Sequence, residues 1–513
     1  MLQENEIQKL VQESLDLAYK KFQEKKFEIV VVITEQLLKV SPDECGAMQL
    51  LGLAYSALKR PEDAKNVLKK CLSYNPENPE TLNDLALCHA NNGEYDEAIN
   101  LLQKAISVKP DMSELYGNLG LQYRHKQDHQ NATCYFKKGL EIKETPIAHA
   151  MLGGCYGEMK EFDNAKTHIK RALELQPDFA AAHVDLASIL CLEGKWDEGF
   201  KEYEWRYDVY DQLKVWKKIY NPSKRWHGED LSGKRLIVHT EQGHGDSIHF
   251  IRYLKPLKEK GAHIILHCND SLKGIFEGLV DEFFTTEPEK IGSWEDGNSL
   301  PKYDYFVPLL SLPHELGSIF TYPSYIRVRR KFDLSNYSGM NKVGIVWAGN
   351  PQHPNDQQRS CKLNMFRGIG NLPNVKLFSL MKDTRKRAYL HQKEPIDLTE
   401  DSDDMKVVNL GEYINDFEDT AAIINSLDLV VGVDTSVLHL AGAMGKPCLL
   451  LLPWNPDWRW EAEGESTIWY GRMHIVRQKI KNDWNSAFEE AEKMVKLFFE
   501  AKKGHVSPHA PLL

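Results

Sequence analysis

Prolines recur at nearly constant intervals through the first part of this 513-residue chain. Pro42, Pro76 and Pro110 are 34 residues apart, and Pro177 follows after about two more periods, with Pro146 displaced inside them. A leucine followed by a small residue returns in the same phase, at Leu51–Gly52, Leu85–Ala86, Leu119–Gly120, Leu152–Gly153 and Leu186–Ala187. Such a period predicts stacked helical units, none of which can bury its apolar face alone.

Small residues also recur in the second half of each period, at Ala64, Ala98, Ala132 and Ala165. A small side chain is expected where two helices touch, with a large one beside it. The pattern resembles the tetratricopeptide repeat, with about six units over residues 8–210. We therefore predict an all-α repeat superhelix over residues 1–210, whose concave face binds a protein partner. A purely structural or dimerising array is the alternative, so a homodimer stays open.

The overall charge narrows the classes of partner. The net charge is −10 and the isoelectric point about 6.0, which argues against nucleic acid as a general partner.

No apolar run reaches membrane-spanning length, and the N-terminus lacks the layout of a signal peptide. Nine scattered cysteines without a C-x-x-C pair suit a reducing compartment, and we predict a cytoplasmic protein without a membrane span.

The periodicity changes after an aromatic-rich linker, residues 211–232. Aromatic residues around it (Trp205, Tyr207, Tyr210, Trp216 and Tyr220) are predicted to join the repeats to the next domain. Beyond it, strands are predicted at 235–239, 263–268, 303–309, 342–349, 374–380, 406–410, 427–433 and 447–453, mostly separated by helices. This alternation predicts an α/β region of two Rossmann-like domains. The predicted bounds are 233–335 for the first domain, 340–503 for the second with its closing helix, and 504–513 for a tail.

The stretch LVVGVDTSVLHLAGAMGKP, residues 429–447, predicts a buried strand, a polar turn and a short helix. Asp434, Thr435 and Ser436 supply oxygens that can cap the helix. The turn also leaves backbone N–H groups and a helix dipole facing the space above the sheet, where an anion such as a diphosphate would bind. An ordinary capped crossover is the alternative.

Four blocks of the second half together resemble a known family. EQGHGDSIHFIRYL, GIVWAGNPQHPNDQQRS, GVDTSVLHLAGAMGKP and LLPWNPDWRW with the following STIWYGRMHIVRQ look like the heptosyltransferase-type glycosyltransferase domain, glycosyltransferase family 9. The likeness covers roughly residues 231–480. Within the family, the chain most specifically resembles bacterial proteins that fuse tetratricopeptide repeats to that domain. The layout is also similar to O-linked N-acetylglucosamine transferases. The resemblance implies a GT-B fold of two Rossmann-like domains, a nucleotide-sugar co-substrate on the C-terminal one and no metal or other cofactor.

The resemblance assigns the role of catalytic base to Asp246, at the head of a helix predicted over 247–259. A helix N-cap is the alternative role for this aspartate. Gly243 and Gly245 would let the backbone approach the sugar or phosphate closely. His244 and His249 are nearby alternatives for the proton.

On the C-terminal domain, the resemblance makes the 434–436 turn the diphosphate site. Asp434, Thr435, Ser436 and the N–H groups up to Val437 would form it, and His439 would contact phosphate or pack. In the family a basic residue near the loop after strand 342–349 neutralises the leaving phosphate. Arg359 is the expected residue, with Lys362 as a second cation, against the alternative of solvated loop charges.

The remaining donor-side predictions lie at strand ends and in one loop. Trp347 and Asn350 end one strand, while Met381 and Lys382, after Leu380, are expected to form a wall for the base or ribose. Asp457 and Trp458, followed by Arg459, lie where the family closes over the sugar. In the family an acidic residue at about this place contacts the ribose, but this chain has no counterpart near Lys382. The resemblance therefore does not imply which nucleotide the donor carries. The acidic stretch 400–406 is interpreted as a solvated turn and not a metal site.

The sequence thus predicts a glycosyltransferase that moves a sugar from a nucleotide donor to a Ser or Thr hydroxyl of a protein chosen by the repeats. A flagellar or surface protein is a candidate acceptor. Transfer to a lipopolysaccharide-type glycan is one alternative. A non-catalytic repeat adaptor with a degenerate GT-B half is another.

Overall fold

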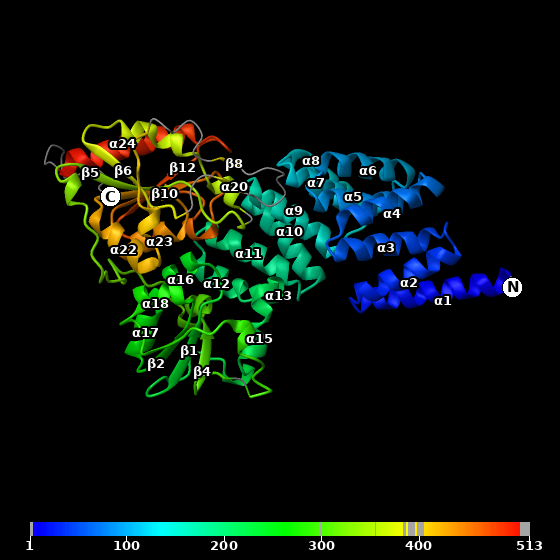
Figure 1. The fold of residues 1–513 in the computed structure, drawn as a ribbon, viewed down its shortest axis with the longest axis horizontal. Helices are drawn as coiled ribbons and strands as arrows, with labels where there is room; N and C mark the ends of the chain where they lie inside the picture. Colours follow the sequence, from blue (N-terminus) through cyan, green and yellow to red (C-terminus); the bar gives the residue numbers. More distant parts are fainter. Residues whose placement is uncertain are drawn as a thin grey trace. The chain divides into compact units, whose positions relative to one another are not determined.

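A computed structural model describes residues 4–297, 299–353, 355–382, 386–387, 396–397 and 405–502. The chain divides into two compact units, with the boundary between Asp185 and Leu186 (Figure 1). The acidic residues 400–404 and the predicted tail 504–513 lie outside the described residues.

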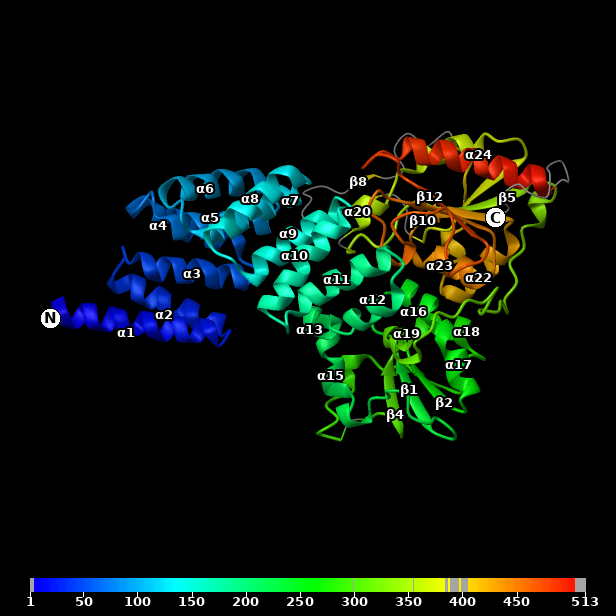
Figure 2. The ribbon, with the colours of Figure 1, turned by 180° about the vertical axis from the view of Figure 1, so that it is seen from behind.

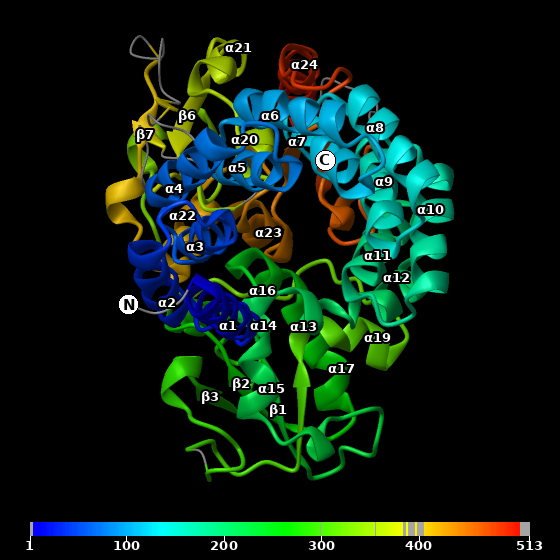
Figure 3. The same cartoon turned by 90° about the vertical axis from the view of Figure 1, so that its right-hand side faces the viewer.

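The first unit consists of antiparallel helical pairs that stack into a superhelix (Figure 3). Gly52 faces Leu68, Gly120 faces Phe136 and Gly153 faces Ile169, each so closely that an added Cβ would clash. The recurring small residues are therefore the contact points between paired helices, and the predicted all-α superhelix is confirmed. Its helices are α1 (Glu4–Gln23), α2 (Phe27–Val40), α3 (Cys45–Ala57), α4 (Pro61–Tyr74), α5 (Pro79–Asn91), α6 (Tyr95–Val108), α7 (Ser113–His125), α8 (His129–Ile142), α9 (Pro146–Glu158) and α10 (Phe162–Leu175), while α11 (Ala180–Leu192) crosses the boundary.

The recurring Pro42, Pro76, Pro110 and Pro177 each lie two residues after the last residue of a helix, whereas other prolines mark helix starts. Pro61, Pro79 and Pro146 lie in the first turn of α4, α5 and α9, where their missing N–H costs no helical bond. Side-chain oxygens of Asn78, Asp128 and Thr145 cap three helices. These local signals mark where α4, α5, α8 and α9 begin.

The second unit starts with short helices and a four-stranded parallel sheet of order β3-β2-β1-β4 (Figure 2). The strands are β1 (Arg235–His239), β2 (His263–His267), β3 (Glu282–Phe284) and β4 (Tyr305–Pro308). The helices are α12 (Trp196–Tyr203), α13 (Arg206–Val209), α14 (Asp211–Lys214), α15 (Trp216–Ile219), α16 (His244–Phe250), α17 (Leu254–Glu259), α18 (Asp270–Phe276) and α19 (Leu312–Leu316). The aromatic residues Tyr207, Trp216 and Tyr220 are buried against this sheet, in one cluster with Ile237 and Ile265.

A second parallel sheet follows, of order β12-β11-β10-β5-β6-β9. Its strands are β5 (Asn341–Val346), β6 (Val375–Ser379), β9 (Val408–Asn409), β10 (Leu429–Val433), β11 (Cys448–Leu452) and β12 (Met473–Arg477). The helices are α20 (Asp356–Arg359), α21 (Arg367–Gly370), α22 (Phe417–Ser426), α23 (Ser436–Ala443) and α24 (Asn485–Lys502). Every residue of β10 and β11 is buried, as expected for inner strands covered on both faces. The predicted α/β region with parallel sheets is confirmed.

The described residues also include one short strand pair outside the two parallel sheets. A small antiparallel pair joins β7 (Lys386–Arg387) to β8 (Ile396–Asp397). Among the described residues, no helix combines the length and the apolar composition needed to cross a membrane.

Candidate active site

A cavity of about 520 Å³ lies at the carboxyl ends of strands from both sheets. The loop between β1 and α16 forms one side, and the turn between β10 and α23 forms another. Helices α16 and α23, which follow this loop and this turn, lie side by side (Figures 1 and 3). The carboxyl edge of parallel sheets is the usual place for a ligand in α/β folds, because the loops that follow the strands meet there.

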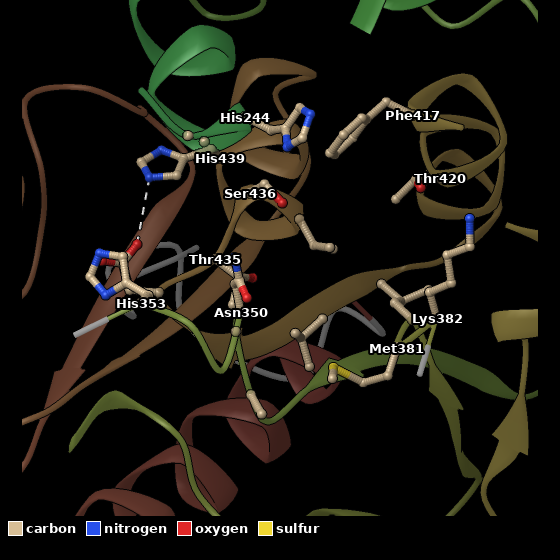
Figure 4. A pocket seen from close by; sticks show the side chains of 18 of the residues that line it. His244, Asn350, His353, Met381, Lys382, Phe417, Thr420, Thr435, Ser436 and His439 are labelled. Atoms are coloured by element: carbon tan, nitrogen blue, oxygen red, sulfur yellow. Dashed lines mark ion pairs between the residues drawn. The ribbon is translucent and has the colours of Figure 1, made fainter. Parts of the chain in front are cut away.

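The β10–α23 turn contributes Asp434, Thr435, Ser436 and Val437 to the cavity (Figure 4). Helix α23 begins at Ser436, so Thr435 is the N-cap residue, yet its side chain makes no capping bond. Its buried Oγ1 has no hydrogen-bond partner within the described part of the chain. The first N–H groups of any helix lack intrahelical partners. The turn therefore offers a hydroxyl and backbone donors to an anion.

Asp434 is tied to His439 and is not a free carboxylate. The His439 Nε2 lies 3.5 Å from Asp434 Oδ1, and His439 Nδ1 lies 2.8 Å from the Tyr470 hydroxyl. Burial alone would raise the pKa of Asp434, but the His439 contact and the Arg359 charge lower it well below its usual range. Asp434 therefore stays ionised and orients the imidazole. Both ring nitrogens of His439 are engaged, although the ring lines the cavity.

Asp246 enters the cavity from the start of α16, but not as the N-cap. The helix begins at His244, with Gly243 as N-cap, so the alternative role of Asp246 as N-cap is wrong. The residue is third in the helix, and its Oδ2 accepts the Gly243 N–H at 3.0 Å. Its Oδ1 forms an ion pair with the Arg459 guanidinium. The predicted continuous helix 247–259 is also divided, into α16 and α17.

Arg459 is a cavity residue for which the sequence predicts no separate role. Its Nη1 lies 2.6 Å from Asp457 Oδ1, and its guanidinium carbon lies 4.1 Å from the centre of the Trp458 ring. Burial would lower the pKa of Arg459, but the Asp246 and Asp457 carboxylates raise it instead. A permanent, largely buried positive charge therefore faces the cavity.

Arg359 supplies a second cation, held by a buried aspartate. Arg359 Nε donates to Asp356 Oδ1 at 3.0 Å, and the Ser360 hydroxyl donates to Asp356 Oδ2 at 3.1 Å. A Cβ at Gly349 would clash with both Arg359 and Asp356, so a larger residue there would displace these side chains. Asn350 and His353 line the cavity beside this loop. Burial and then the Arg359 charge lower the pKa of His353, which keeps its ring neutral.

The opposite wall is largely apolar. Leu380, Met381 and Lys382 follow β6, as expected, and Ile414, before α22, and Phe417, its first residue, also line the cavity. Figure 4 shows Met381, Lys382 and Phe417. The rings of His244 and Phe417 are 5.3 Å apart, and Ser271 Oγ lies 3.2 Å from His244 Nε2. Phe417 and Thr420 also line the cavity, which the sequence did not predict because α22 carries no recognisable motif.

Three predicted residues lie outside this cavity. Trp347 is buried in the core at the end of β5, and the Trp458 ring packs behind the cavity against Tyr203 and Phe250. Lys362 borders a separate hollow beside α24. The other predicted residues line the cavity together: Gly243, Gly245, Asp246, Asn350, Arg359, Met381, Lys382, Asp434, Thr435, Ser436, Val437, His439 and Asp457.

Comparisons with known proteins agree with the two-part layout. Tetratricopeptide repeat models match residues 33–119 and 147–179. The model of glycosyltransferase family 9 (heptosyltransferase) matches residues 397–468, which include the β10–α23 turn, Asp457 and Arg459. The Caulobacter vibrioides protein FlbA is 24% identical over 341 residues, which cover 60% of this chain and 56% of that protein. The aligned part thus spans about half the length of this curated relative.

Two solved structures match part of the chain. A thermophilic tetratricopeptide-repeat protein of Thermus thermophilus is 22% identical, with 35% of this chain and 98% of that chain covered and a TM-score of 0.33. The Pseudomonas aeruginosa protein pilF is 17% identical, with coverages of 41% and 98% and a TM-score of 0.36. Together, the family matches and FlbA support a chain in which tetratricopeptide repeats are fused to a heptosyltransferase-like region of the family 9 type.

Proposed function

We propose that this chain is a metal-independent GT-B glycosyltransferase that moves a sugar from a nucleotide-sugar to a Ser or Thr hydroxyl of a protein. The observation that carries the proposal is the cavity in which Asp246, Arg459, Arg359 and the β10–α23 turn converge. The family 9 match supports a glycosyltransferase and covers that turn.

The donor would bind with its diphosphate on the β10–α23 turn. The unpartnered Thr435 hydroxyl, the N–H groups of the first turn of α23 and the Arg359 guanidinium supply donors and positive charge. The nucleoside would lie along Met381 and Phe417, whose side chains give the apolar wall that a base and ribose need.

In the transfer, the acceptor oxygen attacks the anomeric carbon while the bond from that carbon to the diphosphate oxygen breaks. Asp246 takes the proton of the acceptor hydroxyl, and the diphosphate leaves with the bonding electron pair. Positive charge and preorganised N–H groups at the departing diphosphate replace the metal that other transferases use. Arg359 and the turn supply them, together with Arg459, which also lines the cavity.

The repeats would select the acceptor. Stacked helical repeats bind extended segments of other proteins, which a free glycan acceptor would not require. None of the nine cysteines forms a disulfide within the described residues, which suits a reducing compartment. We propose that the reaction takes place in the cytoplasm, on a client such as a flagellar or surface protein. A homodimer through the repeats stays a prediction that analytical ultracentrifugation would test.

Incubation of the chain with a panel of nucleotide-sugars and a cell extract from which the native enzyme is absent tests the proposal. We expect a sugar mass increment on Ser or Thr of an extract protein with one donor, and no increment with the Asp246→Asn variant. Label on a free or lipid-linked glycan alone would favour the lipopolysaccharide-type reaction. Absence of transfer with every donor would favour the adaptor.

A further inference from the structure

Helix α12 and the start of α13 touch both loops that carry the charged pair of the cavity. We propose that these two helices, at the end of the repeat array, position Asp246 and Arg459, with Tyr203, Arg206 and Trp458 as positioning residues. The proposal rests on the proposed function of the cavity, but its structural part can be tested without a substrate.

The loop that carries Asp246 is attached to these helices at two successive residues. Arg206 and Glu241 are fully buried, and the guanidinium donates to both carboxylate oxygens, from Nε at 3.0 Å and from Nη2 at 2.9 Å. Gln242 Nε2 donates to the Tyr203 hydroxyl at 2.8 Å. Contacts with α12 and α13 therefore fix the position of the start of the loop from β1 to α16.

The loop that carries Arg459 is attached to α12 and to Leu192, the last residue of α11. The Trp458 ring lies 5.3 Å from the Tyr203 ring and 5.8 Å from the Phe200 ring. The Ala462 N–H donates to the Leu192 carbonyl at 2.9 Å. The Arg459 guanidinium also lies over the Trp458 ring, with its carbon 4.1 Å from the ring centre. A cation over a tryptophan face is attracted to it, so the ring sets where the guanidinium lies.

Tyr203 is the side chain that touches both loops. Its hydroxyl accepts from Gln242, four residues before Asp246, and its ring packs on Trp458, next to Arg459. Asp246 and Arg459 then pair with each other in the cavity. The geometry is a closed chain of contacts from Asp246 through its loop, Tyr203 and Trp458 to Arg459.

The buried Arg206–Glu241 pair supports a positioning role. Buried ion pairs often stabilise a fold less than apolar residues of the same size, because both ions lose their hydration. Arg206 also donates to Ser311 and Glu204, at 2.8 Å in each case. Such a network specifies one arrangement of the loop.

Two variants of Trp458 separate positioning from simple packing. Trp458→Phe keeps an aromatic face for Arg459, whereas Trp458→Leu keeps only apolar bulk. We expect Trp458→Leu to weaken the binding of inorganic pyrophosphate and of the best-binding nucleotide among ADP, UDP, GDP and dTDP by about tenfold or more. Trp458→Phe should bind within about threefold of the wild type. Equal affinity of the leucine variant and the wild type would overturn the positioning role of the Trp458 ring.

Hydrogen exchange reports the same positioning without a ligand. In Tyr203→Phe, which removes only the hydroxyl, we expect faster exchange in residues 241–247 and unchanged exchange in α24. The control Phe488→Leu alters a buried ring that packs on Phe366 in the same unit, away from the cavity. It should leave residues 241–247 and 456–462 unchanged.

The binding and exchange measurements distinguish a failure of the proposed function from a failure of the proposed positioning role. If the wild type binds no nucleotide or pyrophosphate, the proposed function fails, and the exchange data alone decide the positioning role. If the wild type binds but neither Trp458→Leu nor Tyr203→Phe changes affinity or loop exchange, the positioning role is wrong and the proposed function stands. Should Trp458→Leu fail to fold, the single-hydroxyl variant Tyr203→Phe gives the decision.

Discussion

The Arg459 guanidinium binds Asp246 across the cavity and so joins the loop after β1 to the loop after β11. The same aspartate accepts the Gly243 N–H on its other oxygen. Both carboxylate oxygens of Asp246 are therefore engaged before any ligand binds. We expect Arg459 to turn toward the donor diphosphate when it binds, which frees one oxygen of Asp246 to accept the proton of the hydroxyl.

Asp246→Asn should abolish transfer while leaving the donor site intact. The amide cannot accept the proton, and loss of a general base lowers turnover by roughly 10²–10⁴-fold. Nucleotide affinity should change by less than about threefold. Turnover and nucleotide titration measured on the same preparation check both statements. Full turnover in the variant would show that another group is the base.

Arg459→Gln should destabilise the fold and weaken nucleotide binding together. The side chains of Arg459, Asp246 and Asp457 are 8%, 17% and 30% exposed, so removal of the cation leaves two partly buried carboxylates unpaired. Breaking a buried pair costs about 3–5 kcal/mol. The matched control is Arg235→Gln, whose pair with Glu282 is 35% and 41% exposed and should cost less than about 1 kcal/mol. Urea unfolding measures both changes, and similar losses in the two variants would contradict the account.

Gly349→Ala should weaken nucleotide binding by displacing Arg359. An alanine Cβ at this position would clash with the Arg359 guanidinium and the Asp356 carboxylate. We expect a fall in affinity of about tenfold, with the guanidinium moved away from the diphosphate. Gly471→Ala is the control, because a Cβ there meets no atom within 4 Å. Calorimetric titration compares them, and unchanged affinity in Gly349→Ala would remove Arg359 from the donor site.

Asp84 should make the first unit less stable as pH rises. Burial, together with the Glu114 and Glu80 carboxylates, raises the pKa of Asp84 to about 7. Its ordinary value, about 3.9, applies in the unfolded chain. Ionisation therefore costs the folded state more than the unfolded one, and stability falls between about pH 4 and pH 7.

Asp84→Asn should remove that loss. Relative to the wild type, we expect a gain of roughly 2–4 kcal/mol at pH 8 and none near pH 4. Asp163→Asn serves as the control, since the Asp163 side chain is 99% exposed. Denaturant unfolding across this pH range measures the difference, and a gain that is the same at both pH values would contradict the assignment.

The repeats and the inner strands were predictable because each depends on a local period. The pairing of Gly120 with Phe136 repeats at the same offset in other pairs, and the fully apolar β10 and β11 are typical of strands covered on both faces. Strands β3 and β12 were not predicted. The first has only three residues, all half-buried, and the second includes the half-buried polar residues His474 and Arg477, so neither has the continuous apolar run by which the others were identified.

A site residue was predictable from the sequence where it directly follows a strand, because the position of its backbone alone brings it to the cavity. The 434–437 turn, Asn350 and Met381 are of this kind. Trp347 and Trp458 were expected in the cavity but pack behind it, since side-chain direction depends on tertiary neighbours such as Tyr203. The pairing of Arg459 with Asp246 joins residues far apart in the chain, which no local pattern encodes.

Titration of the wild-type chain with ADP, UDP, GDP, dTDP and CMP tests the central claim, that the cavity holds a nucleotide-sugar donor. The account predicts that one of these nucleotides binds, and that at about 100 times its dissociation constant it stabilises the chain by roughly 2.7 kcal/mol. Binding should weaken in Gly349→Ala but not in Gly471→Ala. If the wild type binds none of the five nucleotides, the cavity is not a donor site and the chain is better explained as an adaptor.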